Sequence, residues 1–175
     1  MVPDSLSRVD DLGLLSSGLL VVATDVERTT GIRLVLTPWD DPAEGVAALL
    51  HTDTERPTHA VWETIGLLGP GAGLALHPPR AHPTGLASPY GDLSALDTAH
   101  DVADVAQQVT QMVLWENGSD PTWPPCPDHG GVHPLRPRLD TPGWDGQERP
   151  DRPVASVRWT CPSGGGSVPV GALAP

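Results

Sequence analysis

The chain has 175 residues, about the usual size of one domain, so two full domains would be cramped. It carries 22 acidic and 10 basic residues, and its formal net charge of −12 makes it strongly acidic. Phosphate binding requires clustered Arg or Lys, so we expect neither nucleic acid nor an anionic membrane as a partner.

The composition also predicts what fills the core and where the chain changes character. There is no Phe and only one Tyr, so aliphatic residues and six Trp must supply the core. Residues 1–120 hold 17 acids and 5 Arg, which accounts for the whole net charge, whereas residues 121–175 hold 5 of each. Twelve of the 21 Pro also fall after residue 120. We therefore predict an acidic α+β body over 1–120 and a Pro/Gly-rich tail over 121–175.

The apolar run at residues 12–23 does not have the flanks of a secretory signal. Asp10 and Asp11 precede it, whereas a signal peptide needs a positive leader. No run approaches the ~18 apolar residues of a membrane span. We expect a cytoplasmic protein, in which thiols stay reduced and a Cys pair binds metal or acts in redox chemistry more often than it forms a disulfide.

The first half of the chain predicts a small antiparallel sheet. Two β-rich runs, residues 18–26 and 31–37, flank the tetrapeptide E-R-T-T and predict a hairpin. Residues 60–68 and 73–77 predict two more strands around the turn G-P-G-A. Residues 77–89 contain four Pro and predict a loop.

Two helices are expected between and after these strands. The sequence D-P-A-E at 41–44 has an N-cap acid, a Pro at the first helical position and a Glu, which predicts a short helix over 42–51. Residues 98–116 predict a long amphipathic helix, because apolar residues recur there at spacings of three and four. Those residues are Val102, Val105, Ala106, Val109, Met112 and Val113.

The tail predicts three strands, over residues 133–139, 154–161 and 167–173. The middle strand alternates well, so Trp159 and Cys161 should face the same way. The predicted class is α+β, with a small antiparallel sheet packed by one long helix and a three-stranded C-terminal appendage.

The tail also contains the residues whose spacing indicates specific chemistry: Cys126-x2-His129-x3-His133-x27-Cys161. Zinc favours two thiolates and two imidazoles in a tetrahedron, and a C-x2-H step fits one tight turn that presents both side chains to one ion. The glycines after His129 allow the backbone to bend so that His133 also points inward. We predict Cys126, His129, His133 and Cys161 as ligands of a structural zinc ion.

These motifs resemble treble-strand zinc ribbons and, more closely, the tails of uncharacterised actinobacterial proteins with a W-P-x-C-P-x-H, H-x-L, W-x-C-P pattern. The matching positions are Trp123, Cys126, His129, His133, Leu135, Trp159, Cys161, Val168 or Val170, and Leu173. The resemblance covers about residues 121–173, implies a zinc-ribbon-like tail and implies no activity. The chain departs from ordinary ribbons because C-P-S-G offers no ligand two or three positions after Cys161.

Other interpretations of the two cysteines stay open. They could be buried as small hydrophobes in a metal-free, vestigial ribbon, form a Cys126–Cys161 disulfide, or include a catalytic thiol. The ligand set of Cys126, His129 and Cys161 matches the zinc deaminases, but these need a glutamate two residues after the His. That position is Gly131, so the deaminase signature fails.

Two functions remain from the sequence. The first is a non-enzymatic interaction or adaptor protein with an unidentified protein partner and a tail held by structural zinc. The alternative is a small-molecule or peptide-binding α+β domain with a metal-free tail, in which residues 77–89 border an apolar cavity lined by Trp39 or Trp62.

Overall fold

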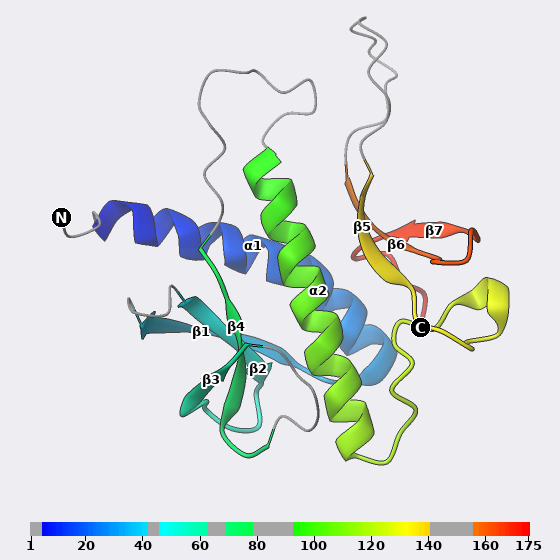
Figure 1. The fold of residues 1–175 in the computed structure, drawn as a ribbon, viewed down its shortest axis with the longest axis horizontal. Helices are drawn as coiled ribbons and strands as arrows, with labels where there is room; N and C mark the ends of the chain where they lie inside the picture. Colours follow the sequence, from blue (N-terminus) through cyan, green and yellow to red (C-terminus); the bar gives the residue numbers. More distant parts are fainter. Residues whose placement is uncertain (1–4, 42–45, 63–68, 79–92, 141–155) are drawn as a thin grey trace, which may run out of the picture.

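A computed structural model describes residues 5–41, 46–62, 69–78, 93–140 and 156–175. It confirms the α+β class, with two helices and two sheets among these residues (Figure 1). The elements in chain order are α1 (Ser5–Thr30), β1 (Leu34–Asp41), β2 (Val46–Thr52), β3 (His59–Val61), β4 (Ala72–Leu76), α2 (Leu93–Glu116), the 3-10 turn η1 (Pro127–His129), β5 (Arg136–Asp140), β6 (Ser156–Thr160) and β7 (Ser167–Pro169).

The predicted strand over 18–26 is wrong, because this segment belongs to the 26-residue helix α1. Leu15, Leu19, Val22 and Val26 are all buried, and their spacings of four, three and four place them on one helical face. Leu20, between them in sequence, is 75% exposed. A strand would have alternated its sides at every residue, so the burial follows the helical period.

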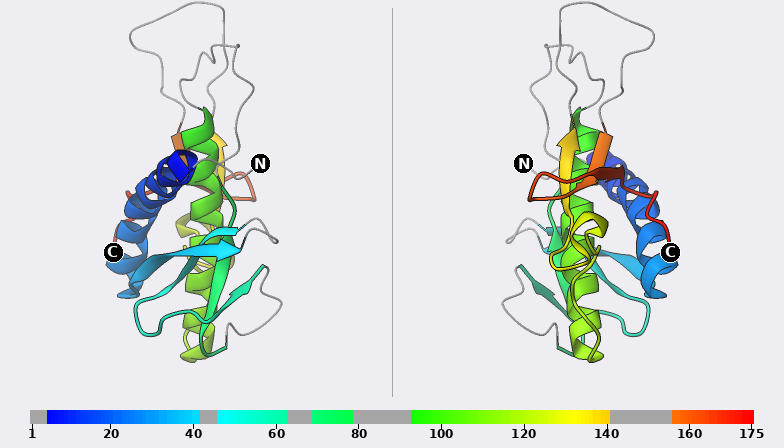
Figure 2. Two further views of the ribbon diagram at one scale, coloured as in Figure 1. Left: turned by 90° about the vertical axis from the view of Figure 1, so that its left-hand side faces the viewer. Right: turned by 90° about the vertical axis from the view of Figure 1, so that its right-hand side faces the viewer.

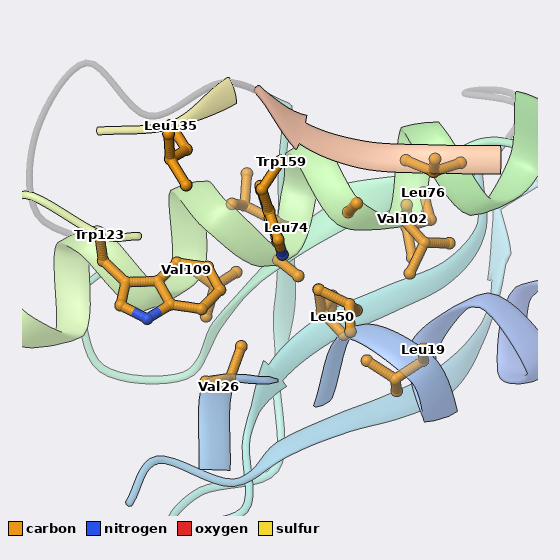
Figure 3. Packing of buried hydrophobic residues seen from close by; sticks show 14 of the residues in the cluster. Leu19, Val26, Leu50, Leu74, Leu76, Val102, Val109, Trp123, Leu135 and Trp159 are labelled. Carbon is orange, nitrogen blue, oxygen red and sulfur yellow. The ribbon is translucent and has the colours of Figure 1, made fainter. Parts of the chain in front are cut away.

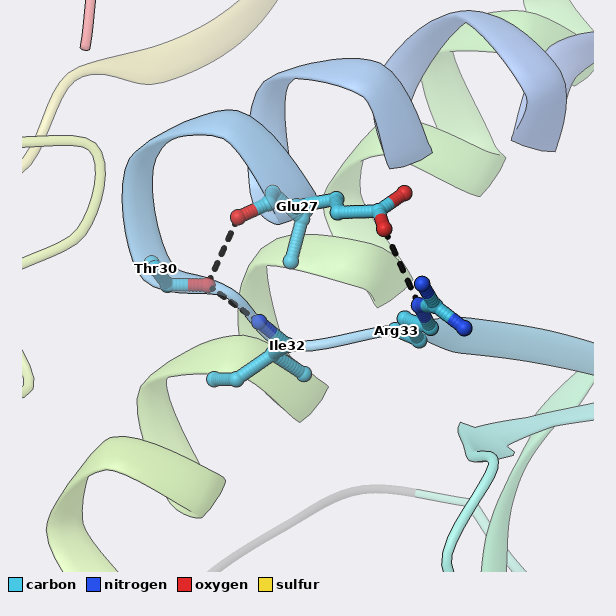
Figure 4. A network of polar contacts seen from close by, with 5 residues as sticks. Glu27, Thr30, Ile32 and Arg33 are labelled. Carbon is cyan, nitrogen blue, oxygen red and sulfur yellow. Dashed lines mark hydrogen bonds and ion pairs between the residues drawn. The ribbon is translucent and has the colours of Figure 1, made fainter.

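The predicted E-R-T-T turn is the last turn of α1, which ends at Thr30 (Figure 4). Gly31 has φ 75°, a left-handed conformation that glycine adopts at no steric cost, and its N–H donates to the Glu27 carbonyl over 2.9 Å. The Ile32 N–H then donates to Thr30 Oγ1, and Arg33 pairs with the Glu27 side chain. These contacts turn the chain from α1 into β1.

The predicted short helix over 42–51 is also wrong for its described part, since residues 46–52 form strand β2. This strand lies inside the sheet of order β1-β2-β4-β3 and pairs antiparallel with β1 and β4. Ala48, Leu49 and Leu50 are fully buried. A short apolar run fits a buried strand as well as a helix, and pairing on both edges decides for the strand.

The remaining strands of this sheet lie where the sequence predicts them in the described residues, but the antiparallel pairing expected throughout is wrong for β3 and β4. β1 overlaps the predicted strand over 31–37, and β4 the strand over 73–77. β3 contains the start of the strand predicted over 60–68 and runs parallel to β4. Residues 63–68, like most of the predicted loop over 77–89, lie outside the described residues.

The long helix predicted over 98–116 is confirmed as α2. It packs against α1, β2 and β4 and also against β5 and β6, so it lies between the two sheets (Figure 1). The two helices approach closely at Gly18, where an added Cβ would lie 3.3 Å from the Ala99 Cα. A Cβ at Gly18 would require the helices to give by a few tenths of an ångström.

The predicted three-stranded C-terminal sheet is present as β5-β6-β7, antiparallel throughout. Its buried residues Val157 and Trp159 join the same hydrophobic cluster as residues of both helices and the first sheet, as Figure 3 shows for Leu19, Leu50 and Val109. The C-terminus lies beside α1 (Figure 2), where Arg28 donates to the Leu173 carbonyl over 2.9 Å.

The boundary near residue 120 stays a prediction, although buried residues on both sides of it share one cluster. Among the described residues, no helix has the length and apolar character needed to cross a membrane.

Candidate metal centre

The first part of the site is a hairpin that carries three of the four predicted ligands. The Cys126 N–H donates to the His133 carbonyl over 3.1 Å, and the Leu135 N–H donates to the Pro124 carbonyl over 2.8 Å. These bonds, with an isolated antiparallel bridge between Pro125 and Pro134, bring the two ends of the segment together, so Cys126 and His133 lie opposite each other. The tip between them contains η1, whose last residue is His129.

Two glycines shape this tip. Gly130 and Gly131 have φ of 60° and 78°, which non-glycine residues rarely adopt. The Gly131 N–H donates to the Cys126 carbonyl over 2.9 Å and closes the turn. The sequence-based expectation that these glycines let the backbone bend back is thus met.

Helix α2 holds this hairpin through a buried amide. Gln107, 1% exposed, donates from Nε2 to the Trp123 carbonyl over 2.9 Å and to the Leu135 carbonyl over 2.6 Å. Gln111 adds a bond of 2.8 Å to the Trp123 carbonyl. The long helix therefore fixes both flanks of the hairpin.

The second part of the site is the turn that follows β6. The Cys161 N–H donates to the Gly166 carbonyl over 3.1 Å, and the Gly164 N–H donates to the Cys161 carbonyl over 3.4 Å. The Ser163 N–H donates to Cys161 Sγ over 3.4 Å. This turn presents the Cys161 sulfur toward the first hairpin and supplies one of the four predicted ligands.

The four predicted ligands converge. One donor atom from each of Cys126, His129, His133 and Cys161 lies within 4.8 Å of the other three. His129 Nδ1 is 3.4 Å from the sulfurs of both Cys126 and Cys161, and His133 Nε2 is 3.9 Å from Cys161 Sγ. Both cysteines are free and buried, so no disulfide joins them. These residues lie close enough to hold a metal ion.

The ring of His133 is oriented by its other nitrogen. His133 Nδ1 lies 3.2 Å from the Pro134 carbonyl oxygen, which only accepts hydrogen bonds. The opposite ring nitrogen, Nε2, faces the cluster and lies 3.9 Å from Cys161 Sγ. A hydrogen bond of this kind is what fixes the tautomer of metal-binding histidines.

The surroundings of Cys126 favour the neutral thiol unless a cation is present. Burial raises the pKa of Cys126 above its usual 9.0, and the neighbouring Cys161 thiol raises it further, while the backbone N–H groups of Asp128 and His129 offset part of the effect. A metal cation would favour the thiolate, because a coordinating thiol is deprotonated.

Two functional contacts were missed by the sequence reasoning. Asp128, beside His129, accepts a hydrogen bond from the Gly166 N–H of the second turn. Asp25, fully buried in α1, accepts from Trp159 Nε1 over 2.7 Å. The sequence signal for Asp25 is an acid within the apolar segment 18–26, whose pattern predicts a strand.

The described residues form a cavity, but its lining differs from the one expected for a small-molecule or peptide-binding domain. A cavity of about 400 Å³ lies between the end of α2 and the turns around β2 and β4. Its lining residues are His51, Thr52, Thr54, Glu55, Gly69, Pro70, Gly71, Ala72, Val113 and Glu116. Neither Trp39 nor Trp62 lines it, and the small-molecule alternative stays a prediction.

The fold and site together define an α+β protein with a Cys2His2 cluster built from two turns. Comparison with family models, curated proteins and solved structures finds no match to this chain.

Proposed function

We propose that Cys126, His129, His133 and Cys161 bind one zinc ion that fastens the C-terminal sheet to the rest of the protein. The observation that carries this proposal is the convergence of four donor atoms within 4.8 Å from turns that are distant in sequence. In a tetrahedral zinc site, bonds of about 2.3 Å to sulfur and about 2.0–2.1 Å to nitrogen separate these ligands by about 3.5–3.6 Å. The sulfur–nitrogen distances of 3.4, 3.4 and 3.9 Å bracket that value.

The donor set supports zinc over other common ions. Thiolate and imidazole ligands suit zinc, whereas magnesium and calcium take oxygen ligands. His129 and His133 each direct one ring nitrogen toward the cluster, and the two sulfurs supply the other two of the four donors that a tetrahedral zinc site needs. The zinc-ribbon-like character of the tail is part of this proposal.

A structural role fits better than a catalytic one. Catalytic zinc sites keep an open position for water or substrate, whereas four side-chain ligands fill the tetrahedron. Gly131 also stands where zinc deaminases carry their general acid/base glutamate. We therefore propose a non-enzymatic interaction or adaptor protein, in which zinc holds the surface that a protein partner would contact.

Metal analysis tests this proposal. Protein purified without chelator should contain one zinc ion per chain, and Cys126→Ser or Cys161→Ser should lose it. His59→Ala serves as a matched control, because His59 is exposed on β3 and outside the four-residue cluster. If wild-type protein contains no zinc and binds none on addition of zinc under reducing conditions, the proposal fails.

A further inference from the structure

The turn after β6 supplies only one metal ligand. The pairing of β5 with β6 ends at Arg136 and Thr160, so it brings the start of this turn beside the first hairpin, and the turn then continues beyond the paired residues. The residues after Cys161 are Pro162, Ser163 and three glycines, which carry no thiol, imidazole or carboxylate. The backbone bonds of the turn, such as Cys161 N–H to the Gly166 carbonyl, set its own shape. They do not set its distance from the first hairpin.

Asp128 bridges the two turns. It lies in η1 between Cys126 and His129, and its Oδ2 accepts the N–H of Gly166 from the second turn. The contact joins residues 38 positions apart in sequence. A carboxylate acceptor makes this bond stronger than one between neutral groups.

The absence of a side chain at Gly165 makes this bridge possible. A Cβ on Gly165 would overlap the same Asp128 Oδ2 and would lie only 3.0 Å from Cys161 Sγ. The carboxyl group, the glycine and the sulfur thus pack against one another. A side chain at Gly165 would therefore disturb both Asp128 and Cys161.

We propose that Asp128 is a positioning residue of the metal site, which takes the place of the missing second ligand in the Cys161 turn. This assignment rests on the proposed zinc binding. The Asp128 carboxyl group is not one of the four proposed ligands; it acts by holding the Cys161 turn at the distance from Cys126 and His129 that one ion can span. Loss of such outer-shell contacts typically costs about 10–100-fold in metal affinity.

The test compares Asp128→Ala, Asp128→Asn and Gly165→Ala with wild-type protein. Zinc affinity is measured by competition with a chromophoric chelator, and site geometry by the visible and near-ultraviolet spectra of the Co²⁺-substituted protein. Asp128→Ala should bind zinc roughly 10–100-fold more weakly and lose tetrahedral Co²⁺ intensity. Asp128→Asn keeps an oxygen acceptor and should recover most of both signals. Gly165→Ala, which changes no charge, should weaken binding in the same direction.

Asp120→Ala is the matched control. Asp120 is also exposed and also accepts a backbone N–H, from Thr122 over 2.8 Å, but within its own turn. It should bind zinc and Co²⁺ as wild type does. If Asp128→Ala matches wild type in affinity and spectrum, the assignment fails while zinc binding stands. If wild type binds neither ion, the proposed function fails and the assignment with it.

Discussion

The indole Nε1 of Trp159 donates a hydrogen bond to Asp25 Oδ2 over 2.7 Å, and both side chains are fully buried. The same carboxyl group accepts the N–H of Gly171 over 2.6 Å and that of Leu173 over 2.8 Å. Asp25 lies on α1, whereas Trp159 lies on β6, two residues before Cys161. One side chain of the first helix therefore holds the last strands next to the candidate metal site.

Replacing that carboxyl group should destabilise the protein. We expect Asp25→Ala to lower the free energy of unfolding by about 2–4 kcal/mol. A buried donor left without a partner costs roughly 1–3 kcal/mol. Three donors bond to Asp25, and one of them is the buried Trp159 Nε1. Urea unfolding measures the change. Glu27→Ala, on the same helix and in a surface pair with Arg33, should cost less than about 1 kcal/mol. Equal losses in the two variants would contradict this account.

Zinc removal should weaken the whole chain rather than the tail alone. Trp123 and Trp159 share one buried cluster with Val22 of α1 and Leu74 of β4. Ligand binding to the native state stabilises by about 4 kcal/mol when free metal exceeds Kd by 1,000-fold. We expect chelation to lower the melting temperature by far-ultraviolet circular dichroism and by Trp fluorescence together. A fluorescence transition that shifts while the dichroism transition stays in place would show a separately folding tail.

The buried amide of Gln107 offers a second stability test. Gln107→Leu keeps the size of the side chain but removes the donor to the carbonyls of Trp123 and Leu135. We expect a loss of about 1–3 kcal/mol in unfolding free energy, together with weaker zinc binding because the hairpin loosens. Gln108→Leu, next to it, removes only a contact with Asp104 one turn away and should leave zinc affinity unchanged. A similar zinc affinity for Gln107→Leu and wild type would contradict the prediction.

His100 should make stability depend on pH. Its hydrogen bond with Asp101 raises the pKa of His100 above the usual 6.5, the Pro137 carbonyl adds to this, and partial burial opposes it. Since the folded pKa is raised, the stabilisation is complete below about pH 6.5 and is lost as pH rises through the folded pKa. The effect should stay below about 1 kcal/mol, because the side chain is 35% exposed.

The test measures the unfolding free energy of wild type and of His100→Gln at pH values from below about 6.5 upward, with the zinc content held constant. The difference between the two proteins isolates the contribution of His100 protonation. The difference should shrink as pH rises. A constant difference between wild type and His100→Gln would rule out protonation of His100 as the cause.

The local features that the sequence predicted well depend on short-range patterns. The helix α2 has apolar residues at helical spacing along its whole length, and β6 alternates so that Trp159 and Cys161 are both buried. The sequence predicted the four Cys and His ligands together for two reasons. The chain has only two cysteines, and the Gly130-Gly131 turn lies between the two histidines. Spacing alone therefore named the residues that converge.

What the sequence by itself determined is thus the α+β class, the long helix α2, the three C-terminal strands and the Cys/His set. Tertiary structure decided the rest, because an apolar run such as residues 46–50 suits a helix or a strand until neighbouring strands pair with both its edges. Long-range contacts such as Asp25 with Trp159 and Asp128 with Gly166 leave no trace in local spacing. Asp25 and Trp159 are 134 positions apart in sequence, and Asp128 and Gly166 are 38 positions apart. Only folding brings each pair within hydrogen-bond distance.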